Sequence, residues 1–123
     1  MTSKGSRLTT VRSEEIQELL AENPFLVMIF FAEWCSPCRS FREVLDDSAK
    51  ENEDVTFAMV DVDRQPDLAE AFGVESVPKI AVIRFGAVVF AHEGALTDEA
   101  IADVLCQVRD LDVELLRRAE ASQ

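Results

Sequence analysis

Hydrophobic and polar positions divide the chain into alternating extended and helical segments. Residues 25–32 (FLVMIFFA) form a continuous apolar run, which is typical of a central strand covered on both faces. Residues 55–63 (VTFAMVDVD) predict a second strand, and residues 78–94 predict two strands joined tightly around Gly86. All of these runs are far shorter than a membrane span, so we interpret them as strands of a buried sheet.

Helices are predicted between the strands from apolar residues at three- and four-residue spacing. Ser13 is the expected N-cap of the first helix, which ends before Pro24. The second begins at residues 35–38, a short third covers residues 65–73, and the fourth begins near Thr97. The order of helix, strand, helix, strand, helix, hairpin and helix predicts an α/β fold. Its mixed sheet would have a parallel βαβ half followed by an antiparallel hairpin, with helices on its faces.

The length of 123 residues, of which 48% are hydrophobic, suits one globular domain over residues 1–123. We expect residues 1–6 to be flexible and residues 109–123 to extend the last helix beyond the core. The formal charge of −12 makes nucleic acids and anionic membranes poor partners.

The N-terminal segment has no apolar stretch of the kind found in secretory signals. Three cysteines are an odd number, and a chain of this size builds a core without disulfide staples. Both observations favour the reducing cytoplasm, where a close cysteine pair is more often catalytic or metal-binding than structural.

Two of the cysteines lie in the segment Cys35-Ser36-Pro37-Cys38. A metal site usually needs about four ligands, and the only further candidates are His92 and Cys106. We expect Cys106 to be a buried residue of the last helix. A structural disulfide would close a very small loop and gain little stability. Redox chemistry is therefore the favoured interpretation, with no metal.

The expected place of the pair explains how it would react. Cys35 lies where a strand ends and a helix begins, so backbone N–H groups and the helix dipole stabilise its thiolate. Cys38 lies one turn further and should be more covered than Cys35. Pro37 fits the first turn of a helix, where a missing N–H costs nothing. One cysteine can then attack a disulfide and the other resolve the mixed disulfide.

The segment FFAEWCSPC resembles the active site of the thioredoxin family, in which Trp-Cys-Gly-Pro-Cys follows a buried strand. The segment VDVDRQPDLAEAFGVESVPK resembles the family's strand, short helix and loop ending in a cis proline, and FGAVVFAHEGAL resembles its closing hairpin. The resemblance extends from Leu8 to Gln107 and implies the thioredoxin fold.

The resemblance also implies roles for individual residues. Cys35 is expected to be the attacking nucleophile and Cys38 the resolving thiol. Substrate proteins would be bound by the residues around them, which are Trp34, Ser36, Pro37, Val77, Pro78 and Gly94. No dissociable cofactor is implied, because the dithiol itself is the redox group.

Several positions depart from the family's pattern. The buried aspartate that manages the proton of the resolving cysteine is replaced by Ile29, and the lysine facing it by Met59. Losing both members of a buried ion pair together is energetically coherent, but it should raise the pKa of Cys38 and slow its deprotonation. Other departures are Ser36, whose hydroxyl could bond near the Cys35 sulfur, Lys79, which could alter the field at the dithiol, Glu93 near the rim, and Glu43 in place of a helix-kinking proline.

The sequence therefore predicts a cytoplasmic thiol–disulfide oxidoreductase that exchanges its dithiol with protein disulfides in the reducing direction, as part of electron transport and redox homeostasis. A separate reductase would supply its electrons. The alternative function is a thioredoxin-fold adaptor, binding or chaperone-like, with a weakly active or regulatory dithiol. We expect a monomer, with the C-terminal helix as the surface for any weak dimer.

Overall fold

The computed structural model describes residues 8–121, with side chains described as far as Leu111. Five strands form one mixed sheet in the order β1-β3-β2-β4-β5. The central strand β2 pairs in parallel with β3 and antiparallel with β4, and every residue of β2 except its last is buried, as its apolar run predicts. The strands are β1 (Leu8–Thr10), β2 (Phe25–Phe31), β3 (Thr56–Asp61), β4 (Lys79–Arg84) and β5 (Ala87–Glu93).

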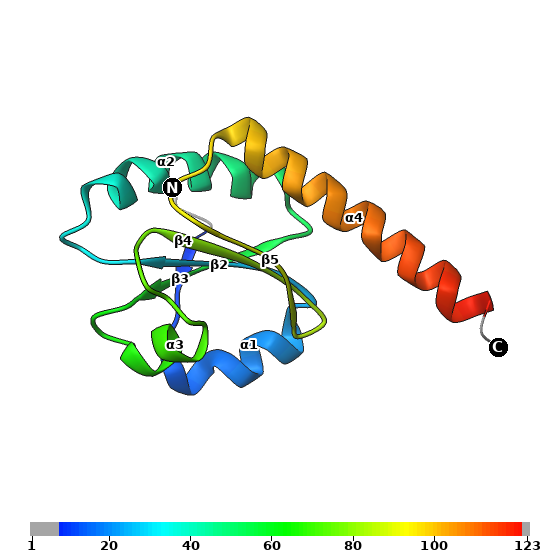
Figure 1. Ribbon diagram of the computed structural model, residues 1–123, viewed down its shortest axis with the longest axis horizontal. Helices are drawn as coiled ribbons and strands as arrows, with labels where there is room; N and C mark the ends of the chain where they lie inside the picture. Colours follow the sequence, from blue (N-terminus) through cyan, green and yellow to red (C-terminus); the bar gives the residue numbers. More distant parts are fainter. Residues whose placement is uncertain (1–7, 122–123) are drawn as a thin grey trace, which may run out of the picture.

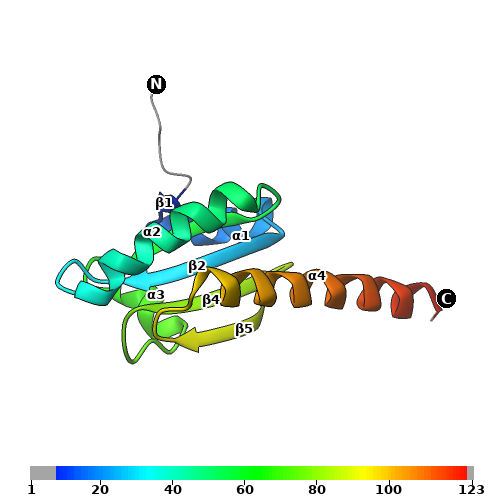
Figure 2. The same cartoon turned by 90° about the horizontal axis from the view of Figure 1, so that it is seen from above.

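Helices cover both faces of this sheet, with α2 and α4 on one face and α1 and α3 on the other (Figure 1). In the view from above, α2 and α4 lie over the same side of the sheet (Figure 2), and the two helices contact each other. The mixed sheet flanked by helices confirms the predicted fold class. The helical elements are the 3₁₀ turn η1 (Ser13–Glu15), α1 (Ile16–Glu22), α2 (Ser36–Glu51), α3 (Pro66–Ala71) and α4 (Asp98–Ala121).

Two hydrophobic cores follow from these layers. The larger lies between the sheet and α2 with α4, where Phe41 and Leu45 of α2 meet Ile101 of α4. The smaller lies on the other face, where Phe30 of β2 and Leu68 of α3 are buried. The alternation of side chains along each strand divides the apolar residues between the two faces, so a continuous apolar run supplies both cores.

Strand β1 is the element that the sequence did not predict. It pairs in parallel with β3 at the edge of the sheet, with Leu8 opposite Phe57 and Thr10 opposite Met59. Only Leu8 of its three residues is buried. Three residues with one buried side chain are too few to show a period of two, so tertiary pairing is what makes this segment a strand.

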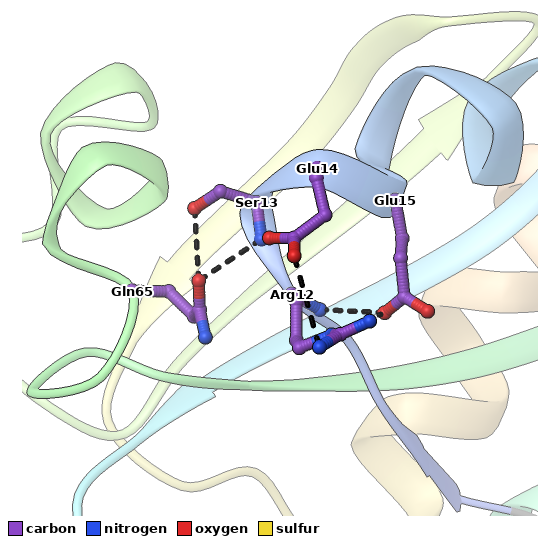
Figure 3. A network of polar contacts seen from close by, with 5 residues as sticks. All are labelled: Arg12, Ser13, Glu14, Glu15 and Gln65. Atoms are coloured by element: carbon purple, nitrogen blue, oxygen red, sulfur yellow. Dashed lines mark hydrogen bonds and ion pairs between the residues drawn. The ribbon is translucent and has the colours of Figure 1, made fainter.

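The start of the first helix also differs from the prediction, because Ser13 is not its N-cap. Ser13 is the first residue of η1, and both its N–H and its hydroxyl donate to Oε1 of Gln65, at 2.9 and 3.0 Å. Glu15 Oε1 accepts instead from the backbone N–H of Arg12 at 2.9 Å (Figure 3). These bonds tie η1 to the residue that precedes α3, and so help to fix the turn after β3.

The hairpin and the last helix agree with the sequence. Phe85 and Gly86 both have positive φ, at 51° and 82°, as a tight two-residue connection requires. The N–H of Ala100 donates to the Thr97 hydroxyl at 3.1 Å, which caps α4. Helix α4 runs on to Ala121 and projects beyond the sheet (Figure 1). The expected flexibility of residues 1–6 lies outside the described residues.

Candidate active site at the Cys35–Cys38 disulfide

Cys35 and Cys38 form a disulfide at the junction between β2 and α2, with their Cα atoms 5.3 Å apart. Cys35 is the N-cap of α2, and its Sγ accepts a hydrogen bond from the backbone N–H of Cys38 at 3.2 Å. Pro37 lies in the first turn, where its ring fits the helical φ. The local sequence therefore places one sulfur where the helix dipole and an N–H donor stabilise negative charge.

The two cysteines are equally covered in this oxidised state. Cys35 is 4% exposed and Cys38 is 6% exposed, so the expectation that Cys38 is the more covered one is wrong here. Both sulfurs belong to a small buried cluster with Ala32, against which Phe31 and Val77 pack. The disulfide bond draws the two side chains together, so that each covers the other.

Trp34 is an exposed aromatic residue beside the disulfide, as its position before Cys35 predicts. Its side chain is held from one end, because Nε1 donates to Oδ2 of Asp63 at 2.9 Å. With 69% of its surface exposed, the indole offers a large apolar face that is fixed in direction. Such a face suits contact with a partner protein.

Val77 and Pro78 form a backbone ledge next to the cysteines, and the bond between them is cis. The carbonyl oxygen of Pro78 accepts a hydrogen bond from the N–H of Gly94 at 2.7 Å. Gly94 has a φ of 104°, a conformation that favours glycine. The structure thus brings Val77, Pro78 and Gly94 together from two separate loops, beside the disulfide that Val77 contacts.

Two departures from the family's pattern, at Ser36 and Lys79, are settled by hydrogen bonding. The Ser36 hydroxyl is exposed and makes no hydrogen bond with any described residue, so the expected bond near the Cys35 sulfur is absent. Lys79 Nζ donates to the carbonyl oxygens of Phe72 and Gly73, at 3.1 and 3.4 Å. The ammonium group therefore stabilises the end of α3 instead of facing the dithiol.

Glu93 and Glu43 are the two remaining departures from the family's pattern. Oε1 of Glu93 accepts a hydrogen bond from the Ser76 hydroxyl at 3.2 Å, which joins the end of β5 to the loop before Val77. Glu43 is exposed in the middle of α2, and the helix runs without a break through this position.

A cleft of about 490 Å³ reaches the disulfide from the side of Cys38. Its floor includes Asp61, which is 5% exposed and accepts hydrogen bonds from the N–H groups of Asp63 and Arg64, at 2.9 and 3.4 Å. Asp61 therefore caps the turn after β3. The sequence did not reveal the cleft, because its charged residues come from segments far apart in the chain. They are Glu33, Arg39, Arg42, Asp61 and Arg64.

Cys106 is exposed in the structure, so the prediction that it is a buried core residue is wrong. The core-facing residues of α4 nearby are Leu105 and Val108, which are 1% and 5% exposed. Cys106 follows Leu105 by one position and therefore points away from the sheet. Within the described part of the chain, no three metal-ligating side chains gather in one place.

Comparison with known proteins identifies the architecture of this site. The family model named Thioredoxin matches residues 7–107. A protein described as putative thioredoxin 2, from Streptomyces coelicolor, is 41% identical over 110 residues, which cover 89% of this chain and 82% of that protein. A thioredoxin from Echinococcus granulosus is 37% identical, over 72% of this chain and 86% of its own length.

Solved structures of thioredoxins are also similar to this chain. A thioredoxin from Nicotiana alata superposes with a TM-score of 0.76 at 30% identity, covering 85% of this chain and 96% of that one. The mitochondrial thioredoxin 3 of Saccharomyces cerevisiae, in its oxidised form, gives a TM-score of 0.75 at 28% identity, covering 81% and 94%. The likeness thus covers both the sequence and the fold around the cysteine pair.

Proposed function

Because this chain belongs to the thioredoxin family and is a thiol–disulfide oxidoreductase, we propose that it reduces disulfides of protein substrates through Cys35 and Cys38. The observation that carries this proposal is the position of the pair at the N-terminus of α2, beside the ledge of Val77 and Pro78. Trp34, Ser36, Pro37 and Gly94 complete the proposed substrate-binding rim.

The proposed reaction starts from the reduced dithiol. The Cys35 thiolate attacks one sulfur of the substrate disulfide and forms a mixed disulfide, and the other substrate sulfur leaves as a thiolate that takes a proton from solvent. Cys38, as its thiolate, then attacks Cys35 Sγ and releases the second substrate thiol. The products are a reduced substrate and the Cys35–Cys38 disulfide seen in this structure.

Cys35 is the proposed attacking residue because it is the N-cap of α2, where its sulfur accepts the N–H of Cys38. The same interactions stabilise its thiolate in the reduced protein. No dissociable cofactor is needed, since two electrons pass between sulfur atoms. A separate reductase would return the two electrons to the disulfide, which makes the protein a carrier in electron transport.

We further propose that the protein acts in the cytoplasm as a monomer. The odd number of cysteines and the exposed thiol of Cys106 favour a reducing compartment. Among the helices described, none has the length and apolar character needed to cross a bilayer. Any dimer would be weak and use the end of α4, whose side chains beyond Leu111 lie outside the described residues.

Reduction of insulin with dithiothreitol as electron source tests the proposal. The protein should accelerate reduction over dithiothreitol alone, and the Cys35→Ser variant should show no acceleration. A Cys106→Ser variant is the control, because it removes a thiol outside the site and should retain the rate. Loss of activity in Cys106→Ser, or full activity in Cys35→Ser, would contradict the assignment.

Variants of the same two cysteines also test the alternative function as an adaptor. Two results together would support an adaptor. The wild-type protein would show no insulin activity, and an unfolded client would still bind after both Cys35 and Cys38 are replaced by serine. A Cys38→Ser variant that accumulates mixed disulfides with clients in cells would support the reductase and identify its substrates.

A further inference from the structure

The cleft beside Cys38 concentrates positive charge in an acidic protein. The chain carries a formal charge of −12, yet three arginines line the cleft together with only two carboxylates, those of Glu33 and Asp61. Cys38 is part of the same lining, whereas Cys35 is not. The cleft therefore exposes the resolving cysteine, and not the attacking one, to a set of guanidinium groups.

The three arginines are not equivalent, because two of them are already engaged. Arg64 Nε lies 3.7 Å from Oδ2 of Asp61, so these two charges largely offset each other. Arg39 Nη2 donates to the carbonyl oxygen of Glu33 at 3.1 Å, and residues one apart on a helix do not face each other. This hydrogen bond holds the Arg39 guanidinium at the loop before Cys35, although Arg39 still lines the cleft.

Arg42 differs from the other two arginines. It follows Cys38 by four positions on α2, so the two side chains lie on the same helical face with Cβ atoms about 5–6 Å apart. Within the described residues, no hydrogen bond or ion pair engages its guanidinium. Its charge is thus available to the sulfur at the end of the cleft.

We propose that Arg42 stabilises the thiolate of Cys38 across this cleft and thereby speeds the resolving step of the reaction. The proposal rests on the proposed function, because it concerns the second of its two exchanges. In that exchange the Cys38 thiol gives its proton to solvent, its thiolate attacks Cys35 Sγ, and the substrate sulfur leaves as a thiolate. A cation close to the sulfur favours the first of these events.

Arg42 supplies a charge near the dithiol, where the apolar residues at positions 29 and 59 supply none. Ile29 and Met59 are 1% and 2% exposed and bring no charge to the dithiol. Met59 nevertheless lines the cleft together with Arg42, so part of the cleft wall is apolar. Arg42 thus brings a positive charge from α2 to the cleft that Met59 and Cys38 also line.

Three carboxylates near the Cys38 sulfur or near Arg42 could oppose this effect, those of Glu33, Asp46 and Asp61. Asp61 of β3 is neutralised by Arg64 and by two backbone N–H groups. Glu33 lies in the exposed loop before Cys35, and Asp46 lies one helical turn beyond Arg42, on the side away from Cys38. Arg42 is therefore the charged side chain nearest to Cys38 on the same face of α2.

The first test measures the ionisation of Cys38 directly. In a Cys35→Ser, Cys106→Ser background Cys38 is the only thiol, and its rate of alkylation by iodoacetamide between about pH 6 and pH 10 gives its pKa. Adding Arg42→Gln should raise this pKa by about 0.5–1 unit, as expected for one charge at this separation in a partly solvated cleft. Arg42→Lys should restore most of the shift.

Lys50→Gln is the matched control, because it removes one positive charge from the far end of the same helix. It should leave the pKa of Cys38 unchanged, and added salt should shrink only the effect of Arg42→Gln. An Arg42→Gln variant whose pKa shift is zero, downward, or no larger than that of Lys50→Gln overturns the proposal. Arg42 is exposed, so the substitution leaves the fold intact.

The second test separates this proposal from the proposed function. Reduced Cys106→Ser protein is mixed with 5,5′-dithiobis(2-nitrobenzoate), and the release of thionitrobenzoate is followed by stopped flow. The first release reports attack by Cys35, and the second reports resolution by Cys38. Arg42→Gln should slow only the second release, by about two- to fourfold, since lower thiolate content is partly offset by higher nucleophilicity. Equal slowing of both releases, or of neither, would count against Arg42, whereas absence of the first release would contradict the proposed function.

Discussion

Ile29 lies directly opposite Met59 where β2 pairs in parallel with β3, and both side chains are buried under α2. These are the two positions at which the thioredoxin pattern has an aspartate and a lysine. In this register an aspartate at position 29 and a lysine at position 59 would face each other. Because Ile29 and Met59 replace both charged residues, no unpaired charge is left in the core. The pair makes the effect of restoring a charge predictable.

Ile29→Asp should lower the free energy of unfolding by about 3 kcal/mol near neutral pH, because it buries an unpaired carboxylate. Burial raises the pKa of such a carboxyl in the folded state above its unfolded value of about 3.9. The ionisation cost is therefore absent below that pH and grows as the pH rises towards the folded pKa. Urea unfolding at about pH 4 and pH 7 would measure both terms.

The double variant Ile29→Asp, Met59→Lys provides the control for this prediction. It should recover part of the stability lost in Ile29→Asp, because the two charges face each other across β2 and β3. A cost for Ile29→Asp that is the same at both pH values would show that lost packing, and not the buried charge, is responsible.

Asp63→Ala should make Trp34 more mobile, because the bond from Nε1 to Oδ2 is the one that holds the indole. Trp34 is the only tryptophan of the chain, so its fluorescence anisotropy reports this motion without a label. We expect kcat/KM with insulin to fall about two- to fivefold, in line with the loss of one exposed hydrogen bond. The rate with a small disulfide reagent should change less.

Asp63→Asn and Asp67→Asn separate the effect of the hydrogen bond from Trp34 to Asp63 from the effect of removing a negative charge. The first keeps an acceptor oxygen for the indole and should have a smaller effect. The second removes one exposed charge from the first turn of α3 and should leave the anisotropy of Trp34 unchanged. Anisotropy that does not respond to Asp63→Ala would show that packing, and not this bond, orients Trp34.

Arg109 ties α4 to the loop between α2 and β3. Its guanidinium donates to Asp54 at 3.0 and 2.7 Å and to Asn52 Oδ1 at 2.9 Å. Arg109→Gln should lower the free energy of unfolding by about 1 kcal/mol, the upper range for a partly exposed pair with bidentate geometry. Chemical denaturation would measure the loss, with Lys50→Gln as the control for removing one positive charge.

The same ion pair predicts a pH dependence. The hydrogen bond from Arg109 lowers the pKa of Asp54 below its usual value. The stabilisation is therefore complete above about pH 4, the unfolded pKa of an aspartate, and is lost as the pH falls through the lower folded pKa. The difference in stability between the wild type and Asp54→Asn should shrink over that acidic range. A difference that persists unchanged below it would contradict the ion pair.

The exposure of Cys106 predicts that the native, oxidised protein has one reactive thiol. Iodoacetamide should label Cys106 without denaturant, and mass spectrometry should locate the label on α4. Labelling that begins only after unfolding would restore the interpretation of Cys106 as a core residue. The Cys106→Ser variant should remain unlabelled in both states as long as its disulfide is intact.

Local sequence patterns predict some elements of this protein better than others. Hydrophobic periodicity placed β2, β3, the hairpin and α2 correctly, because each is long and has one clear pattern. It failed at Ser13 and at Cys106. A serine before an amphipathic run is a general capping signal, but here the side chain of Gln65, distant in sequence, takes both of its donors.

Local patterns in the amino-acid sequence predict the α/β class and the position of the cysteine pair at the start of a helix, and the residues at positions 29 and 59 reveal the loss of the buried charge pair. These are local properties, set by side-chain period, turn residues and the identity of single positions. The tertiary structure alone decided that β1 joins the sheet, that Gly94 meets Pro78, and that Arg42 and Asp61 line one cleft with Cys38. Such neighbours depend on the strand order and on the packing of α2 over the sheet, which bring distant residues together by contacts that no local pattern contains.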